Sequence, residues 1–303
     1  MDKCSNFIKN GLFGSYPNQS SVNEYENLGV RYFIDLTESG EKNIVRYNTK
    51  YTYINYPIQD RHVPSCWKSF SELIIKITNI IKNLEKYEKI YIHCKGGHGR
   101  SGILVACLLC YLYKITPAEA IAKTTIYHNK RKIMKEKWRK MGSPQTRKQK
   151  KFVTKFFEPL YIYKNYSNYF TSFFNNDADI KVKIPGFGIF PTANAAFQAF
   201  KDPYNNEYVG RLESSRDKKE IDDIISKCNQ RHDWDDIKDS IMLNVLKHKF
   251  DQHNNIRENL LQTGLRPFII LSNDMYWGRN NTSGKNVFGK ILGQVRNNLY
   301  ITG

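Results

Sequence analysis

The sequence has 303 residues, 40% hydrophobic and 25% charged, with a formal net charge of +18, which is typical of a folded protein with room for two domains and favours phosphorylated or polyanionic partners. Six cysteines at irregular intervals, without paired CxxC motifs, argue against a disulfide scaffold, and the N-terminus does not resemble a secretory signal, so we expect a reducing, cytoplasmic compartment. The longest apolar stretch, Ile103 to Tyr113, is shorter than the ~20 residues of a membrane span, so no membrane partner is expected.

Strand-like and helix-like segments alternate from residue 30 to residue 157. Tyr32 to Leu36 and Tyr51 to Tyr56 are rich in β-branched and aromatic residues and predict strands. Ser65 to Leu84 has apolar residues at helical spacing and predicts a helix with one buried face. Lys89 to His93 predicts a short buried strand that leads into a glycine-rich turn.

The helices that follow this turn complete the first half. Ser101 to Tyr113 is apolar on nearly every face and predicts a central buried helix. Thr116 to Glu119 combines an N-cap, a proline and a capping-box glutamate, and a last helix is expected to end near Phe157. The fold class predicted for this half is α/β, with a mainly parallel central sheet flanked by helices.

The densest basic run covers residues 128–140. It is interpreted as a solvated helix face, so nucleic acid is a possible partner but not a favoured one.

The second half is predicted to be mainly helical (α+β). Residues 158–183 show no clear periodicity and are expected to bridge two domains, which we place at residues 1–157 and 165–303 with a linker at 158–164. Pro191-Thr192 predicts the start of a short helix, Trp234 to His253 a longer one, and Asn286 to Leu299 the last.

A cysteine followed by a glycine-rich turn carries the chemistry of the first half. In His93 to Gly102 (HCKGGHGRSG), a strand ends, a tight loop follows and a helix begins, so backbone N–H groups and the helix start form a cradle for an anion. Gly96, Gly97 and Gly99 allow a close backbone approach to that anion. Cys94 at its base is expected to be a thiolate nucleophile.

Other side chains complete this predicted site. Arg100 would hold two phosphate oxygens with its planar fork, and the Ser101 hydroxyl would help the sulfur leave. Asp60, in a loop after a strand, is the candidate acid for the leaving oxygen, although it could instead only cap the next helix. Lys95 and His98 would add positive charge at the rim or be solvated. The chemistry requires no metal or other cofactor.

These residues resemble the protein tyrosine phosphatase superfamily, and the spacing from Asp60 to Cys94 resembles its dual-specificity branch. The resemblance covers about residues 8–157 and implies hydrolysis of phosphate monoesters on a phosphoprotein or a phosphorylated small molecule. Rhodanese-type sulfurtransferases also place a cysteine in such a loop, but they lack the following Arg-Ser and need no upstream acid.

The second half has aromatic and polar residues at predicted helix starts. Trp234-Asp235 and Asp274 to Gly278 could stack on a base and hold ribose hydroxyls, or the two tryptophans could be core residues. Together with Pro191 to Lys201 and Gly284 to Gly289, these segments resemble the YbiA-like, or NADAR, family over residues 165–303.

That resemblance implies cleavage of an N-glycosidic bond in ribosylamino intermediates of riboflavin biosynthesis or in ADP-ribosyl compounds. It implies Lys201 as the amine that attacks the anomeric carbon and Asp274 as a proton-transfer or ribose-binding residue. The implied substrate-binding residues are Trp234, Asp235, Trp277, Gly278 and Asn286. The family commonly has a glutamate where this chain has Asn194, and another acidic residue near Ile269.

Because an amide cannot act as an acid or base, two hypotheses stay open. The chain is either a bifunctional hydrolase or a phosphatase joined to a non-catalytic domain that binds nucleotide or ADP-ribose. The joined arrangement resembles proteins of giant DNA viruses of amoebae, which would place it in the host cytoplasm.

Overall fold

The computed structural model describes residues 2–163 and 172–302. The chain forms two compact units that divide between Glu158 and Pro159, and each is described by itself. No helix of the described residues is long and apolar enough to cross a membrane.

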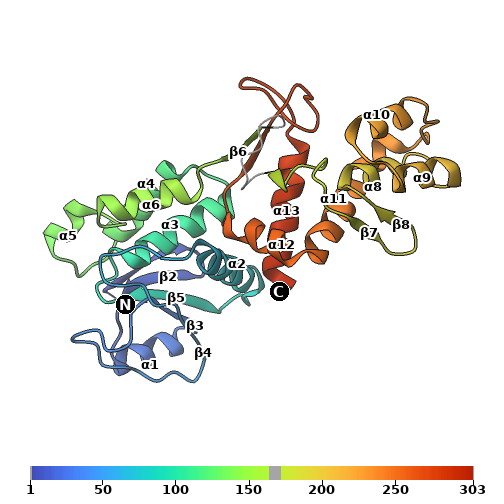
Figure 1. Ribbon diagram of the computed structural model, residues 1–303. Helices are drawn as coiled ribbons and strands as arrows, with labels where there is room; N and C mark the ends of the chain where they lie inside the picture. The colour runs from blue at the N-terminus through green and yellow to red at the C-terminus, as the bar shows by residue number, and fades with distance from the viewer. Residues whose placement is uncertain (1, 164–171, 303) are drawn as a thin grey trace. The chain divides into compact units, whose positions relative to one another are not determined.

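The first unit is built on a five-stranded sheet of order β1-β2-β5-β3-β4 (Figure 1). Strands β2, β5, β3 and β4 are parallel, and β1 pairs antiparallel with β2 at one edge. The strands are β1 (Cys4–Ile8), β2 (Gly11–Ser15), β3 (Val30–Asp35), β4 (Thr52–Asn55) and β5 (Lys89–Cys94). The α/β class and the mainly parallel sheet are confirmed. The β1–β2 pair was not predicted.

Helices cover both faces of this sheet, with α1 on one side and α2 to α6 on the other (Figure 1). The helices are α1 (Gln19–Asn27), α2 (Trp67–Asn83), α3 (Arg100–Tyr113), α4 (Pro117–Asn129), α5 (Glu136–Met141) and α6 (Arg147–Phe156). Helix α3 is buried from Arg100 to Cys110, as its unbroken apolar sequence predicts. Thr116 and Glu119 form the predicted capping box of α4.

The second unit is mainly helical with two small sheets. Its strands are β6 (Leu160–Tyr163), β7 (Val182–Ile184), β8 (Gly188–Phe190) and β9 (Phe268–Leu271). Its helices are α8 (Ala193–Ala199), α9 (Asn206–Glu213), α10 (Lys218–Ser226), α11 (Trp234–Gln252), α12 (Asn254–Gln262) and α13 (Val287–Thr302). Helices α8, α11 and α13 match predicted segments, and Thr192 caps α8 as expected.

The region expected to be a linker contains a strand. Leu160 to Tyr163 form β6, which pairs in parallel with β9 from Leu160↔Phe268 to Tyr163↔Leu271. Residues 160–163 therefore belong to the second unit, and residues 164–171 lie outside the described part of the chain.

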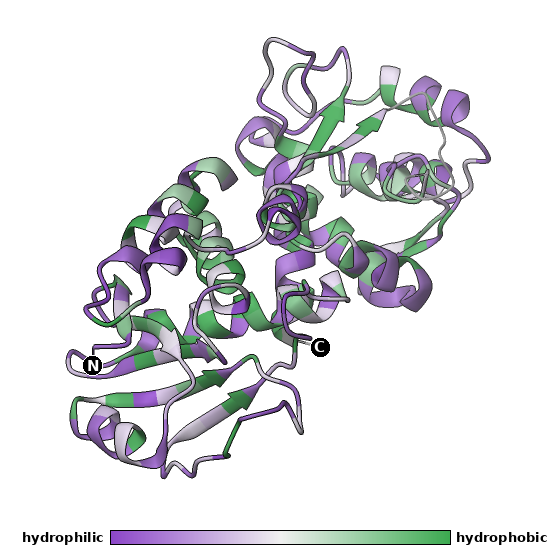
Figure 2. Cartoon of the chain, turned by 90° about the vertical axis from the view of Figure 1, so that its left-hand side faces the viewer, coloured by the Kyte–Doolittle hydropathy of each residue, from purple (hydrophilic) through white to green (hydrophobic). Residues whose placement is uncertain are grey.

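In Figure 2 the central strands are largely hydrophobic and many helices carry both colours, as expected where one helix face packs on a core.

Candidate active sites

The cysteine loop of the first unit joins β5 to α3. Cys94 ends β5 with 3% of its surface exposed, and the Gly97 N–H lies 3.3 Å from its Sγ. The Ser101 hydroxyl oxygen lies 3.6 Å from the same sulfur. Gly97 has φ +74°, and a Cβ there would lie 2.3 Å from the carbonyl carbon of Gly14, so only glycine fits. Loop and helix start therefore surround the sulfur with donors suited to an anion.

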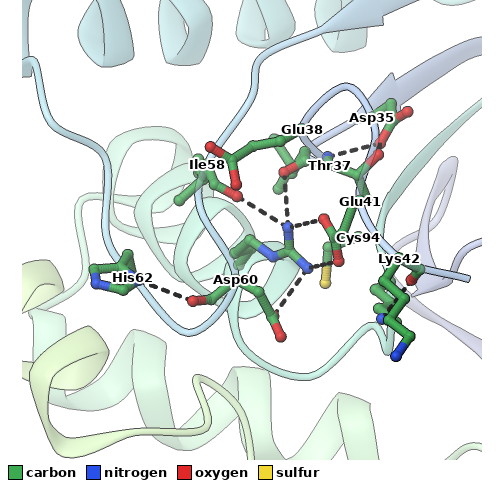
Figure 3. Close-up of polar contacts among 12 residues, drawn as sticks. Asp35, Thr37, Glu38, Glu41, Lys42, Ile58, Asp60, His62 and Cys94 are labelled. Carbon is green, nitrogen blue, oxygen red and sulfur yellow. Dashed lines mark hydrogen bonds and ion pairs between the residues drawn. The ribbon is translucent and has the colours of Figure 1, made fainter. Parts of the chain in front are cut away.

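Arg100 is almost fully buried, and its guanidinium is held by two carboxylates. Glu41 accepts hydrogen bonds from both terminal nitrogens, at 2.7 and 2.9 Å, and the hydrogen bonds with Arg100 lower the pKa of Glu41. Asp60 Oδ1 accepts from one of these nitrogens at 2.9 Å, and the Ile58 carbonyl accepts from the other at 2.9 Å. Figure 3 shows Glu41, Asp60 and Ile58 converging from two loops, so the arginine is oriented by loops outside the cysteine segment.

The loop that carries Glu41 is itself anchored to the sheet. The buried carboxylate of Asp35 accepts from Arg46 at 2.7 Å and from the Tyr53 hydroxyl at 2.6 Å. The second terminal nitrogen of Arg46 donates to the Glu38 carbonyl at 2.9 Å. These bonds fix both ends of the loop around Glu41. Glu41 was not predicted, because nothing in its local sequence marks it as a partner of Arg100.

The loop that carries Asp60 lies at the mouth of the same site. The Asp60 side chain is 56% exposed, so it can meet a ligand, and its ion pair with Arg100 places it beside the cysteine loop. Gln149 of α6 donates to the His62 carbonyl at 3.2 Å and packs against Gly99, where a Cβ would lie 2.7 Å from Gln149 Nε2. Helix α6 thus contacts both the candidate acid loop and the cysteine loop.

Lys95 keeps a cation beside the cysteine loop, whereas His98 differs from the expectation of a rim charge. Lys95 Nζ donates to the Lys42 carbonyl at 2.7 Å. His98 Nδ1 lies 2.8 Å from His128 Nε2 and its ring stacks on Trp138, and burial lowers the pKa of His98 to about 3. His98 is therefore neutral at pH 7 and adds no positive charge.

The basic run at residues 128–140 is not one helix face. It spans the end of α4, a connecting segment and the start of α5. His128 and Arg131 are buried, and Arg131 lies over the Phe13 ring and donates to the Phe13 carbonyl at 3.2 Å. Part of the run thus has a structural role, while its exposed lysines remain solvated.

A cavity of about 690 Å³ lies in the second unit, which is within the range of small-molecule sites. Asp274, Trp277 and Gly278 line it, as do Asn194 and Ile270. Trp277 packs edge-on against Phe197, also a wall residue, at 5.5 Å between ring centroids. The described wall therefore offers an indole ring and carboxylates.

Other predicted residues lie away from this wall. Trp234 is 5% exposed and packs behind Phe197 at 5.0 Å, so it is a core residue. Lys201 Nζ lies 5.7 Å from the centroid of the Trp234 ring, and burial lowers the pKa of this lysine. Neither residue is part of the cavity lining.

Asp235 and Asn286 also have local partners outside the cavity. Asp235 is 80% exposed and pairs with Lys238 at 2.6 Å. Asn286 accepts from Ile270 N–H at 2.9 Å and donates to the Phe268 carbonyl at 2.8 Å, so it holds β9 in place. These contacts account for the polar side chains of Asp235 and Asn286 without any bound ligand.

Two polar residues of this unit were not predicted. Asp177 lines the cavity and accepts a hydrogen bond from Asn194 at 2.8 Å. Lys249 is fully buried and donates to the Asn175 carbonyl at 2.8 Å, and burial lowers its pKa to about 7. Asp177 lies in a segment without periodicity, and no role was assigned to Lys249 from its place in the helix that begins at Trp234.

Two family models match successive parts of the chain. Residues 12–149 match the model of the dual specificity phosphatase catalytic domain, and residues 155–300 match that of the NADAR domain. “Putative tyrosine phosphatase 197R” of Invertebrate iridescent virus 6 is 32% identical over 294 residues, which cover 96% of this chain and 90% of that protein. The chain belongs to this viral family. It carries a dual specificity phosphatase domain followed by a NADAR domain.

Relatives of the single domains are also found. “N-glycosidase YbiA” of Shigella flexneri serotype 5b is 33% identical over 132 residues, covering 42% of this chain and 81% of that protein. The NMR structure of E. coli YbiA is 27% identical, covers 48% of this chain and 86% of that chain, and has a TM-score of 0.43. The crystal structure of Tk-PTP is 19% identical, covers 50% of this chain and 93% of that chain, and has a TM-score of 0.40.

Proposed function

We propose that the phosphatase domain hydrolyses phosphate monoesters through a phosphocysteine. Cys94 Sγ attacks phosphorus, an S–P bond forms, and the ester O–P bond breaks as Asp60 gives its proton to the leaving oxygen. Water then attacks phosphorus, and the thiolate leaves with help from the Ser101 hydroxyl. The arrangement of Gly97 N–H and Ser101 Oγ around one buried sulfur carries this proposal.

The hydrogen bonds of Arg100 indicate how the substrate would enter. Glu41 accepts hydrogen bonds from both terminal nitrogens of Arg100, and Asp60 accepts a further hydrogen bond from one of them. A phosphate that binds the edge formed by Nε and this nitrogen must displace Asp60 but can leave Glu41 in place. The displaced Asp60 is then free to meet the leaving oxygen. Binding of the phosphate would thus free the Asp60 carboxylate to take up a proton from solvent, which it donates in the next step.

We further propose that the NADAR domain hydrolyses the N-glycosidic bond of a ribosylamino compound, with intermediates of riboflavin biosynthesis or an ADP-ribosyl group as candidate substrates. The likeness to “N-glycosidase YbiA” and the cavity lined by Trp277 and Asp274 support this activity. Lys201 remains the candidate amine through the family resemblance. Its place beside the Trp234 ring, outside the cavity lining, does not add support.

A binding domain without turnover is the second candidate for this half. Asn194 and Ile270 both line the cavity, and neither side chain can take up or release a proton. This observation favours a domain that recognises a nucleotide or ADP-ribose without cleaving it and thereby targets the phosphatase.

Release of ribose 5-phosphate from the first ribosylamino intermediate of riboflavin synthesis tests the glycosidase proposal. Wild type is compared with Lys201→Ala and with Cys94→Ser as the matched control. Loss of release only in the lysine variant supports a glycosidase that uses Lys201. No release from wild type, with an aryl phosphate still hydrolysed, rejects this substrate and favours the binding domain.

The phosphocysteine proposal is tested with the same variants. Wild type quenched in acid during turnover of a 32P-labelled aryl phosphate should retain label on Cys94, and Cys94→Ser should not hydrolyse the ester. Hydrolysis that survives this substitution would reject the proposal.

A further inference from the structure

One side of the NADAR cavity contains more hydrogen-bond acceptors than the protein satisfies. Asn176 and Gln198 both line the cavity, and the Oδ1 of Asn176 and the Oε1 of Gln198 are buried without a partner among the described residues. Buried polar atoms normally find a partner, so two orphan acceptors on one wall point to a ligand that brings donors.

Asp177 lines the same cavity as these two residues. Its Oδ1 accepts from Asn194 Nδ2 at 2.8 Å, and Asn194 Oδ1 accepts from Gln198 Nε2 at 3.1 Å. The backbone supports the same arrangement, because Asn194 N–H donates to the Asn176 carbonyl at 2.9 Å. The second carboxylate oxygen of Asp177 accepts no hydrogen bond from the described residues. A chain of two amides therefore orients one carboxylate at the cavity wall.

The other carboxylates of the wall are engaged or exposed. Asp274 Oδ1 accepts from the backbone N–H groups of Tyr276 and Trp277, at 2.9 and 3.0 Å, and its side chain is exposed. Asp222 is paired with Lys218, and Asp179 is exposed. Among the described carboxylates of the wall, Asp177 is the one that is half-buried, is held by the side chain of another wall residue, Asn194, and keeps an oxygen for a ligand.

We propose that Asp177, oriented by Asn194 and flanked by Asn176 and Gln198, is the subsite for the vicinal hydroxyls of a ribofuranosyl group. A carboxylate accepts two hydroxyls of a diol, and amide oxygens accept further hydroxyl hydrogens. Trp277 on the same cavity offers a face for the base. The proposal deepens the proposed function of the NADAR domain, since it assigns the sugar-binding residues. It does not require that the domain cleave the sugar.

Binding of ribose 5-phosphate and 2-deoxyribose 5-phosphate to the full chain tests the subsite. The Cys94→Ser variant is the parent throughout, so that the phosphatase does not consume the probes, and calorimetry gives both affinities. We expect the parent to bind the ribosyl compound about tenfold more tightly, since a hydrogen bond to a charged group is lost with the deoxy sugar. Asp177→Asn should abolish this preference, and Asp179→Asn, the matched carboxylate two residues away, should retain it.

Moving the carboxylate from position 177 to position 194 sharpens the test. In Asp177→Asn with Asn194→Asp, the carboxylate and the amide exchange places across the same hydrogen bond, so part of the preference should return. Thermal unfolding of each variant checks that the fold is kept. A preference that persists in Asp177→Asn overturns the proposal. It is also overturned if the parent binds neither sugar. Binding of the diamine 1,4-diaminobutane in place of the sugars would overturn it too, because the carboxylate would then serve an ammonium group and not a diol. Sugar preference without any N-glycoside cleavage would support the subsite and reject the glycosidase.

Discussion

The two domains differ in how their polar groups are brought together. In the phosphatase domain, nucleophile, anion cradle, arginine and serine come from one segment of β5, loop and α3. In the NADAR domain, the cavity wall combines residues near β6, from α8, α10 and α11, and from the segments around β9. A contiguous site leaves a pattern in the sequence, whereas a dispersed site depends on packing. Even in the phosphatase domain, Glu41 and Asp60 come from separate loops.

The largest effect should come from the contiguous segment itself. Arg100→Lys keeps the positive charge but removes the planar fork, so we expect kcat/KM for an aryl phosphate to fall by about a thousandfold. Steady-state kinetics measures this, with Lys95→Ala as a control that removes a nearby cation whose ammonium donates to the Lys42 carbonyl. A loss below tenfold in Arg100→Lys would show that charge alone suffices.

Asp60→Asn tests one of the two loops outside the cysteine segment. We expect kcat to fall by about a hundredfold for an alkyl phosphate, because an amide cannot protonate the leaving oxygen. The loss should be much smaller for a substrate whose leaving group needs no proton, such as p-nitrophenyl phosphate. Equal losses on both substrates would assign Asp60 a structural role through its bond to Arg100.

Glu41→Gln should have a smaller effect, since the amide oxygen can still accept one bond from Arg100. We expect kcat/KM to fall about tenfold as the guanidinium loses its fixed orientation. Glu38→Gln, in the same loop, is the control. A gain in activity would instead mean that Glu41 competes with phosphate for Arg100.

The last effect is on stability rather than on activity, and it concerns the NADAR domain. Burial lowers the pKa of Lys249 from 10.5 to about 7. Between these pH values the unfolded chain binds a proton that the folded chain does not, so the free energy of unfolding should rise with pH from about 7 to about 10, by up to about 1.4 kcal/mol per pH unit.

Lys249→Met should remove this rise, and Lys247→Met, at an exposed position on the same helix, should retain it. Hydrogen exchange of α11, corrected for the intrinsic pH dependence of exchange, measures the opening free energy. A rise that is equal in both variants would place the titrating group elsewhere.

The difference between a contiguous site and a dispersed site also explains which features could be predicted from the sequence. The strand, loop and helix around Cys94 follow from local pattern, and α4 follows from the capping residues Thr116 and Glu119. The helices α8, α11 and α13 also follow from periodicity. Trp234 could not be assigned in this way, because an indole beside a carboxylate has the same local sequence whether it lines a cavity or packs behind Phe197. Glu41 and Asp177 depend on contacts with residues far along the chain.

The pairing of β6 with β9 determines where the two domains can be separated. A fragment that begins at residue 165 would lack β6 and leave one edge of β9 without its hydrogen-bonding partner. A hydrophobic strand edge of this kind promotes association between chains. Any gene rearrangement that transfers the NADAR domain intact must therefore take the chain from Pro159 onward, only one residue after the end of the phosphatase unit.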